Sequence, residues 1–395
     1  MKEKFLRELA DIQTGPFGSQ LHKEDYVADG TPIVTVEHLG NKMFSEQNLP
    51  RVSNTDKNRL KKYVLKQGDI VFSRVGSVDR CSYVDQKHDG WMFSGRCLRV
   101  RPTSEIDSEY LYYYFCLEET KQFVRNIAVG ATMPSINTKL LGEVVVTFPE
   151  LEQQKRISGI LSAIDSKIEV NQKINDNLEQ QAANYFQELF INNANPVWQI
   201  STISDLGTVV GGSTPSKTKP EYYTNNGIAW ITPKDLSINK SKFISHGEND
   251  ITELGLKNSS ATVMPKGTVL FSSRAPIGYI AIASNEVTTN QGFKSVIPYS
   301  EIGTAFVYFF LKHSLPVIES AASGSTFKEI SGSAMKNIPA IIPDRNTLDQ
   351  FNSFCAPIFA QQKILEEQNH SLAMLRDSLL PKLMSGAIDI ASIQL

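Results

Sequence analysis

The two halves of this 395-residue chain carry the same short motifs in the same order, each 194 to 199 positions from its counterpart. A single match of this kind arises by chance, whereas an ordered series at a nearly constant offset indicates a duplicated structural unit. We therefore expect two copies of one domain. The paired motifs begin at Ala10 and Ser204, Gly30 and Gly227, Lys66 and Pro265, Glu109 and Ala305, and Gly130 and Gly324.

Each copy ends in a long stretch with the composition of a helix. The stretch from Leu151 to Phe190 contains one Gly, no Pro and many Glu, Gln, Lys, Asn and Ala residues. Its apolar residues recur at alternate steps of four and three, which is the 3.5-residue period of a coiled coil. The same steps recur from Phe351 onward. The expected seam consists of Ile157, Leu161, Ile164, Ile168, Asn175, Leu178, Phe351, Ile358, Leu365, Asn369 and Leu372.

Two helices of one chain, each following its own domain, can pair antiparallel when the domains lie at opposite ends. We expect this arrangement here. Two alternatives stay open: each helix packs on its own domain, or the seam pairs with another copy of the chain. Asn175 and Asn369 occupy equivalent positions, so antiparallel pairing would bring them near one another, where polar side chains select the register.

Each globular half contains short β-branched runs bounded by Gly, Pro or Asp, which are typical of strands. Helices are expected at Tyr110–Gln122 and Ala305–His313. The expected fold class is α+β: two repeated α/β domains, residues 1–149 and 191–343, separated by two long helices, residues 150–190 and 344–395, that form an antiparallel coiled coil. The expected strands are IVFSR from 70, CLRVRP from 97, EVVVTFP from 143, VLFSSR from 269, KSVIP from 294 and IPAIIP from 338.

Composition narrows the class of protein. Hydrophobic residues make up 41% and charged residues 21% of the chain, as in soluble globular proteins. The four cysteines show no CxxC spacing, which argues against a zinc site and for reduced thiols. The amino terminus lacks an apolar run, and no segment approaches 18 apolar residues in succession. We therefore expect a cytoplasmic protein without a metal site.

Charge is unevenly distributed along the chain. The net charge of −2 comes from the long helices, which carry −3 and −2, whereas residues 1–149 carry +1 and residues 191–343 carry +2. So small an imbalance permits contact with phosphates without demonstrating it.

Catalytic motifs are approximate at best. Asn195-Pro-Val-Trp198 resembles the Asn-Pro-Pro-aromatic motif of amino-methyltransferases, but Val197 replaces the second Pro and no Gly-rich cofactor loop accompanies it. The run Gly211 to Thr218 imitates a phosphate-binding loop, but Ser216 replaces its second Gly. The six histidines have no nucleophile or carboxylate at motif spacing. We expect no catalytic residues in this chain.

The chain resembles the specificity subunits of Type I restriction-modification enzymes over essentially its whole length. The sharpest resemblance lies in GDIVFSRVGSV at 68–78 and in the run from Gly130 through Phe190. The resemblance implies two target recognition domains, each recognising one half of a split, asymmetric site in double-stranded DNA. It also implies that two paired helices set the gap between the half-sites and carry two modification subunits.

The resemblance further implies that the chain itself binds no cofactor. S-adenosylmethionine would bind to the modification subunits, and ATP and Mg would bind to two restriction subunits. The second copy departs from the family pattern, because Pro343-Asp-Arg-Asn-Thr-Leu stands where the first has Pro149-Glu-Leu-Glu-Gln-Gln. Pro381 is also expected to break the second long helix.

Direct readout of DNA needs side chains such as Arg, Lys, Asn, Gln, Ser or Thr on a rigid support, and Arg to guanine is the commonest specific contact. Arg74 and Arg274 each follow a matching strand directly. Surface salt bridges or loop hydrogen bonds are an equally open role for every candidate. The expected DNA-contacting residues are Arg74, Arg96, Thr132, Ser135, Arg274, Gln291, Lys294, Ser325, Thr326 and Lys328.

Arginine is distributed unequally between the halves. Residues 1–149 contain nine arginines, whereas residues 191–343 contain only Arg274. We therefore expect the two domains to recognise different base sequences. The alternative function, from another class, is a two-domain coiled-coil scaffold that binds protein partners and does not recognise DNA.

Overall fold

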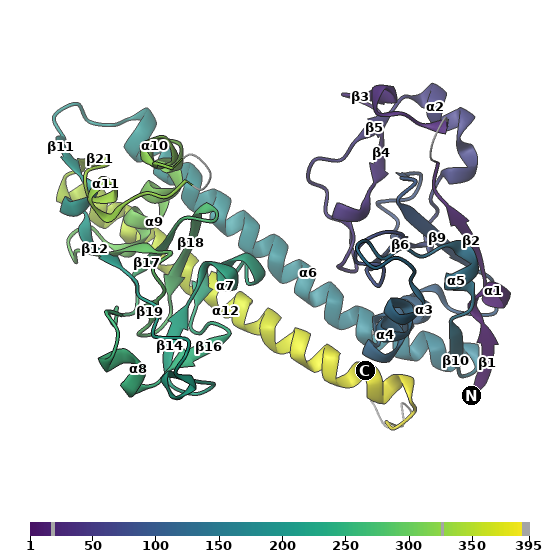
Figure 1. Cartoon of the computed structure of the whole chain (residues 1–395). Coiled ribbons are helices and arrows are strands. Elements are labelled where there is room, and N and C mark those ends of the chain that lie inside the picture. The colour runs from purple at the N-terminus through teal and green to yellow at the C-terminus, as the bar shows by residue number, and fades with distance from the viewer. Residues whose placement is uncertain (17–19, 325–327, 389–395) are drawn as a thin grey trace. The chain divides into compact units, whose positions relative to one another are not determined.

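The structure is a computed structural model that describes residues 1–16, 20–324 and 328–388. The chain divides into two compact units, Met1–Glu169 with Ser371–Leu395, and Val170–His370. We call these unit 1 and unit 2. The division falls inside both long helices, α6 (Leu151–Gln187) and α12 (Arg345–Met384). Each unit therefore contains one globular part and a segment of each long helix (Figure 1).

Unit 1 contains two four-stranded sheets and a two-stranded ribbon among its described residues. The first sheet has the order β2-β9-β6-β7 and is antiparallel, and the second has the order β3-β5-β4-β8. The ribbon pairs the two ends of the globular part. The strands are β1 (Lys2–Phe5), β2 (Ala10–Thr14), β3 (Tyr26–Val27), β4 (Thr31–Val34), β5 (Arg51–Val52), β6 (Ile70–Ser73), β7 (Cys81–Tyr83), β8 (Met92–Phe93), β9 (Cys97–Pro102) and β10 (Val145–Phe148).

The central strand β6 is buried on both faces. Ile70 and Phe72 pack in the core that the helices cover, whereas Val71 packs in the core shared with the second sheet. This alternation follows from the two-residue period of a strand. The helices are α1 (Leu6–Leu9), α2 (Asn54–Arg59), α3 (Ser108–Cys116), α4 (Glu118–Ile127) and α5 (Thr138–Gly142).

Unit 2 repeats this plan with one additional strand. Its sheets have the orders β12-β20-β17-β18-β15 and β13-β16-β14-β19, and its ribbon pairs β11 with β21. The strands are β11 (Gln199–Thr202), β12 (Gly207–Gly211), β13 (Tyr223–Thr224), β14 (Ile228–Ile231), β15 (Phe243–Ile244), β16 (Asn249–Ile251), β17 (Val269–Ser273), β18 (Ile277–Ala283), β19 (Thr288–Thr289), β20 (Lys294–Pro298) and β21 (Pro339–Ile342).

The cores of unit 2 follow the same logic. Val269 and Phe271 of β17 pack in the core that contains α9, and Leu270 packs on the opposite face. Helix α9 lies against β17 and β18 (Figure 1). All six strands expected from the sequence are present, which confirms a mixed helix and sheet architecture in both halves. The helices are α7 (Pro233–Ile238), α8 (Glu253–Lys257), α9 (Thr304–His313), α10 (Leu315–Ala321) and α11 (Gly332–Lys336).

The helix expected at Tyr110–Gln122 is wrong as a single element. The chain is extended at Leu117, with ψ of 133°, so α3 ends at Cys116 and α4 begins at Glu118. The two acids Glu118 and Glu119 favour a new helix amino terminus there. The break allows Phe115 and Val124 to pack in the same core. The helix expected at Ala305–His313 is confirmed as α9.

The expected break of the second long helix at Pro381 is also wrong. Helix α12 continues to Met384, and the Ser385 amide donates to the Pro381 carbonyl at 3.0 Å. The missing amide hydrogen of the proline is offset by burial, because Leu380, Leu383 and Met384 all pack in the core of unit 1. Gly386, with φ of 74°, provides the left-handed residue that typically follows a helix.

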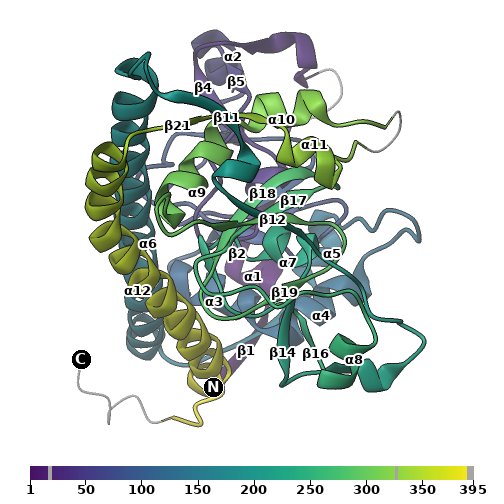
Figure 2. The same ribbon diagram turned by 90° about the vertical axis from the view of Figure 1, so that its left-hand side faces the viewer.

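Segments of α6 and α12 contact one another within each unit. In unit 2, Asn171 Nδ2 donates to Asn369 Oδ1 at 2.9 Å, and Gln362 Nε2 donates to the Asn175 carbonyl at 3.1 Å. In unit 1, Arg376 Nη1 donates to Asp165 Oδ1 at 2.8 Å. Figures 1 and 2 show the unit 2 segments of the two helices side by side.

The asparagine found beside Asn369 is Asn171, one helical turn before the Asn175 that we expected from the offset. Asn171 and Asn175 are both buried. All the residues expected on the seam are buried or half-buried: Ile157, Leu161, Ile164, Ile168, Asn175, Leu178, Phe351, Ile358, Leu365, Asn369 and Leu372.

Candidate nucleic-acid interface

Three loops of unit 1 meet at the carboxyl end of β6. The Arg74 amide donates to the Arg96 carbonyl at 2.8 Å, and the Ile136 amide donates to the Arg74 carbonyl at 2.9 Å. The Gly76 amide donates to the Pro134 carbonyl at 2.8 Å. The structure therefore brings together the loops that carry all four expected contact residues of the first half.

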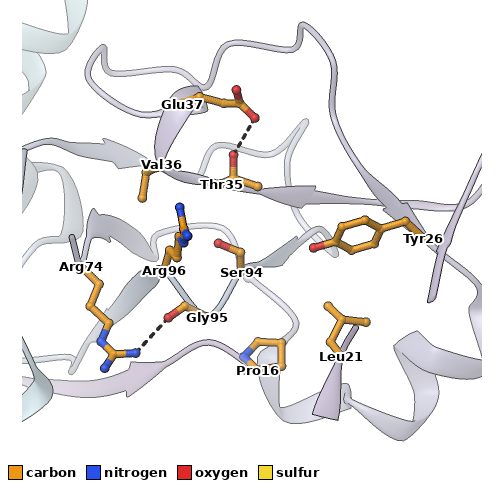
Figure 3. Close-up of a pocket in the computed structure, with 10 residues that line it drawn as sticks. All are labelled: Pro16, Leu21, Tyr26, Thr35, Val36, Glu37, Arg74, Ser94, Gly95 and Arg96. Carbon is orange, nitrogen blue, oxygen red and sulfur yellow. Dashed lines mark hydrogen bonds between the residues drawn. The ribbon is translucent and has the colours of Figure 1, made fainter. Parts of the chain in front are cut away.

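These loops border an open hollow of about 630 Å³. Arg74 and Arg96 line it, and the hydroxyl groups of Tyr26 and Ser94 point into it (Figure 3). Thr132 and Ser135 lie outside this lining, in the loop that follows α4, where the Ser135 hydroxyl donates to the Val129 carbonyl at 3.2 Å. The remaining lining residues are Pro16, Leu21, Thr35, Val36, Glu37 and Gly95.

Most arginines of the first half have roles inside the protein. Seven of the nine donate to carboxylates or carbonyl oxygens, among them Arg74, whose Nη1 donates to the Gly95 carbonyl at 3.1 Å. Within the part of the chain that the structure describes, only Arg80 and Arg96 have no partner for their guanidinium groups. Of these two, Arg96 lines the hollow.

Two further groups of the hollow supply hydrogen-bonding atoms. Burial raises the pKa of Tyr26, and the charge of Asp25 adds to this shift. Its phenol therefore stays protonated, and able to donate, at neutral pH. Glu37 offers the opposite chemistry, because its exposed carboxylate accepts a hydrogen bond only from the Thr35 hydroxyl among the described residues, at 3.1 Å.

The corresponding loops of unit 2 meet in the same way, but the arginine lies one residue later in the chain than in unit 1. The Ser273 amide donates to the Gly292 carbonyl at 2.7 Å, and the Ile330 amide donates to the Ser273 carbonyl at 3.1 Å. Ser273 thus occupies the place of Arg74. Val269–Ser272 match Ile70–Ser73 residue for residue, so Arg274 takes the place of Val75. The one-to-one matching of Arg74 with Arg274 that the sequence indicated is therefore wrong by one residue.

Glu329 occupies the place of Ser135 in the second half and changes its electrostatics. Arg274 Nη1 lies 3.4 Å from Glu329 Oε2, and Lys294 Nζ lies 3.8 Å from Glu329 Oε1. One acid therefore neutralises the two expected cations. Gln291 is exposed and accepts from the Thr214 hydroxyl.

Of the three contact residues expected in the loop after Gly324, only Lys328 is described, and it is exposed. Ser325 and Thr326 lie outside the described residues.

Sequence reasoning missed Glu37, Tyr26 and Glu329. Glu37 could have been found from the sequence. It lies three residues after the end of β4, and the motif that contains this strand begins at Gly30, which matches Gly227. Glu329 was not detectable, because its position opposite Arg274 depends on a loop some 55 residues later that returns to the end of β17.

The described ranges lack two other kinds of feature. They contain no group of three or more His, Cys, Asp or Glu side chains placed to hold a metal ion. No helix among them is long and apolar enough to cross a lipid bilayer.

Comparison with known proteins places this geometry in a family. Over residues 1–180 and 196–369 the sequence matches the family described as the Type I restriction modification DNA specificity domain. A 160-residue stretch is 43% identical to the Type I restriction enzyme MjaIX specificity subunit of Methanocaldococcus jannaschii, covering 40% of this chain and 37% of that protein. The chain thus matches little more than a third of the length of that relative.

A longer match extends over most of the chain. The Type I restriction enzyme HindI specificity subunit of Haemophilus influenzae is 24% identical over 407 aligned residues, which cover 83% of this chain and 88% of that protein. The fold is similar to the crystal structure of a Type-I restriction-modification system S subunit from M. genitalium, with a TM-score of 0.60 and 17% identity over 97% of this chain and 95% of that one. Because the family match covers both halves separately, this chain belongs to the Type I restriction modification DNA specificity family and contains two copies of its domain.

Proposed function

We propose that this chain is the non-catalytic DNA-recognition subunit of a Type I restriction-modification complex. The observation that carries the proposal is the presence of two separate matches to the DNA specificity domain in one chain, at residues 1–180 and 196–369. We assign the recognition domains to residues 1–149 and 191–343, and the spacer helices to residues 150–190 and 344–395. Each domain recognises one half of a bipartite site, and the site is asymmetric because the two halves differ in charge and side chains.

We further propose that the two long helices form an antiparallel coiled coil that sets the gap between the half-sites. Contacts inside each unit support this arrangement, notably Asn171 with Asn369 in unit 2 and Arg376 with Asp165 in unit 1. Burial opposes the charge of Arg376, but its hydrogen bond to Asp165 and the charge of that residue raise the pKa of its guanidinium. The Arg376 guanidinium therefore stays charged at every physiological pH.

The proposed partners are double-stranded DNA, two modification subunits that bind S-adenosylmethionine and two restriction subunits that bind ATP and Mg. The chain itself needs no cofactor for recognition. The proposed DNA contacts lie on the converging loops of the two units: Arg74, Arg96, Thr132 and Ser135 in the first, and Arg274, Gln291, Lys294, Ser325, Thr326 and Lys328 in the second.

The test is binding of the chain to mixed duplex DNA at several salt concentrations, with and without a methylating partner. Contacts between Lys or Arg and phosphates release counterions, so the logarithm of the binding constant must fall as the logarithm of the salt concentration rises. Sequencing of the methylated sites made by the complex then gives the two half-sites. A scaffold that binds only proteins would show neither the salt slope nor a methylated sequence.

The spacer role has its own test. Four residues inserted after Lys173 lengthen a helix by about 6 Å, which corresponds to roughly two base pairs of duplex. We expect the methylated sites of the variant complex to keep both half-sites and to have a longer gap. An active variant with altered half-sites and the original gap would contradict the spacer role.

A further inference from the structure

The hollow of unit 1 contains one strong donor and one strong acceptor that the protein itself leaves largely unused. Among the described residues the guanidinium of Arg96 has no partner, and this residue is exposed. The Glu37 side chain is 68% exposed, with the Thr35 hydroxyl at 3.1 Å and His38 Nε2 at 3.9 Å. Both side chains line the same hollow (Figure 3).

Both residues are held on a rigid support. The Arg96 carbonyl accepts from the Arg74 amide at 2.8 Å immediately before β9. Glu37 lies in the short helix Val36–His38 that follows β4. Buried His38 fixes that turn, because its Nδ1 accepts from the Thr35 amide at 2.9 Å and its Nε2 donates to the Gln47 carbonyl at 3.0 Å. Side chains on such a support lose little freedom when a ligand binds.

The second half has lost both groups at the equivalent positions. The Ser94 amide donates to the Val34 carbonyl at 2.9 Å, and the Asn290 amide donates to the Ile231 carbonyl at 3.0 Å. These equivalent hydrogen bonds match Ser94 with Asn290 and Val34 with Ile231. Gly292 then occupies the place of Arg96. Lys234 occupies the place of Glu37 and pairs with Glu248 at 2.5 Å. The donor and acceptor are therefore not required by the fold.

The chemistry of the pair matches one base pair in the major groove. Guanine presents the two acceptors O6 and N7, which Arg binds with two hydrogen bonds, and cytosine presents the N4 amino group, which Glu accepts. An A·T pair instead presents an adenine amino group where guanine has O6, so an Arg loses one of its two bonds. The hydroxyl groups of Tyr26 and Ser94 suit either base or the adjacent phosphates.

We propose that the first recognition domain recognises a G·C base pair through this hollow, with Arg96 donating to guanine O6 and N7 and Glu37 accepting from cytosine N4. This inference rests on the proposed function as a DNA-recognition subunit. Arg74 is the positioning residue. Its amide donates to the Arg96 carbonyl and its guanidinium donates to the Gly95 carbonyl, which holds the loop that carries Arg96.

The first test compares methylated sites made by complexes of the full chain with its methylating partner. We expect Arg96→Ala to lower the preference for G·C at one position of one half-site by about tenfold to a hundredfold. Arg96→Gln should favour A·T at that position, because Gln bonds adenine. The other half-site and the gap should stay the same. Arg7→Ala is the matched control, because it removes an equal charge from an exposed pair with Glu143 in the same unit.

The second test needs no variant. In duplexes that carry the recognised site, 7-deazaguanine replaces each guanine in turn and removes only its N7 acceptor. We expect one substitution in the affected half-site to weaken binding of the wild-type complex about tenfold, and Glu37→Gln to weaken discrimination at the same base pair. The Arg96→Ala complex should be insensitive to that substitution.

Three results would overturn the proposal. The first is that the site recognised by the wild-type complex contains no G·C pair in either half. This result would overturn the proposal even if every variant complex were inactive. The second is an active Arg96→Ala complex with an unchanged site. The third is a uniform loss of affinity on all sequences with a smaller salt slope, which identifies Arg96 as a phosphate contact. Failure of the proposed function itself is distinct, because the wild-type complex would then methylate no defined sequence.

Discussion

The two globular parts share strand order and loop hydrogen bonds, yet their charged side chains are paired differently at the carboxyl ends of β6 and β17. In unit 1 the loops expose Arg96 beside an acceptor, Glu37. In unit 2 the equivalent loops place Glu329 within 4 Å of Arg274 and Lys294, and Gln291 bonds Thr214. The two copies of the fold therefore share a framework of main-chain hydrogen bonds and differ in the side chains of these loops.

A second comparison concerns how each globular part is attached to the long helices. The Lys42 and Lys242 carbonyls accept from equivalent amides, those of Tyr83 at 2.8 Å and Ile282 at 2.7 Å. Lys42 Nζ donates hydrogen bonds to Glu109 Oε1 at 2.7 Å and to Ser162 Oγ of α6 at 2.9 Å. Corresponding lysines thus connect a domain loop to a long helix in both units.

The lysine of unit 2, Lys242, is more deeply buried than Lys42. Lys242 Nζ bonds Gln362 Oε1 of α12 at 2.6 Å, pairs with Glu179 of α6 and lies 4.1 Å from the centre of the Phe359 ring. Burial lowers the pKa of Lys242, and the charge of Glu179 opposes that shift. Burial opposes the charge of Glu179 too, but Lys242 and Lys312 together lower its pKa.

The largest expected effect follows from this difference. Lys242→Ala leaves Glu179 partly buried beside only one cation, so we expect the free energy of unfolding to fall by about 3–5 kcal/mol. Lys42→Ala, at a wetter site, should lower it by about 1–3 kcal/mol. The measurement is urea denaturation of both variants at neutral pH. Lys234→Ala is the control, because its pair with Glu248 is exposed and should contribute about 1 kcal/mol or less. Equal losses of unfolding free energy for Lys42→Ala and Lys242→Ala would show that the deeper burial of Lys242 has no energetic consequence.

An intermediate effect tests the role of Glu329. We expect Glu329→Ser to strengthen DNA binding of the complex about fivefold, because it releases Arg274 and Lys294 from an opposing charge. The reverse exchange, Ser135→Glu, should weaken binding by a similar factor. Both are measured as dissociation constants on the recognised duplex across a salt series. If neither exchange changes affinity, these loops do not approach DNA.

The smallest effect concerns the two buried asparagines of α6. In the described part of the chain the Oδ1 atoms of Asn171 and Asn175 are both buried without a hydrogen-bond partner, but the Nδ2 of Asn171 also donates to Asn369. We therefore expect Asn175→Leu to raise the free energy of unfolding by about 1 kcal/mol. Asn171→Leu should not raise it, because it removes the bond to Asn369. A denaturation midpoint that rises for Asn171→Leu and falls for Asn175→Leu would reverse this assignment.

Local sequence patterns were sufficient for α6 and for the six strands named in the sequence analysis. The 3.5-residue period and the absence of Pro predicted α6, and β-branched runs bounded by turn residues predicted the strands, because both signals arise from neighbouring residues. The constant offset between motifs predicted two related halves. The loops that carry Arg74 and Arg96 could be chosen because they follow or precede these strands, and the loop of Ser135 because it begins at Gly130, which matches Gly324.

Only the tertiary structure decided which side chains share an environment. Glu329 neutralises Arg274 only because a loop some 55 positions later returns to the end of β17. Helix α12 continues through Pro381 because Leu380 and Leu383 are buried in a core formed mainly by residues far earlier in the chain. Asn369 meets Asn171 because two distant helices pack in a particular register. Such outcomes depend on contacts between residues far apart in sequence, and no local pattern contains them.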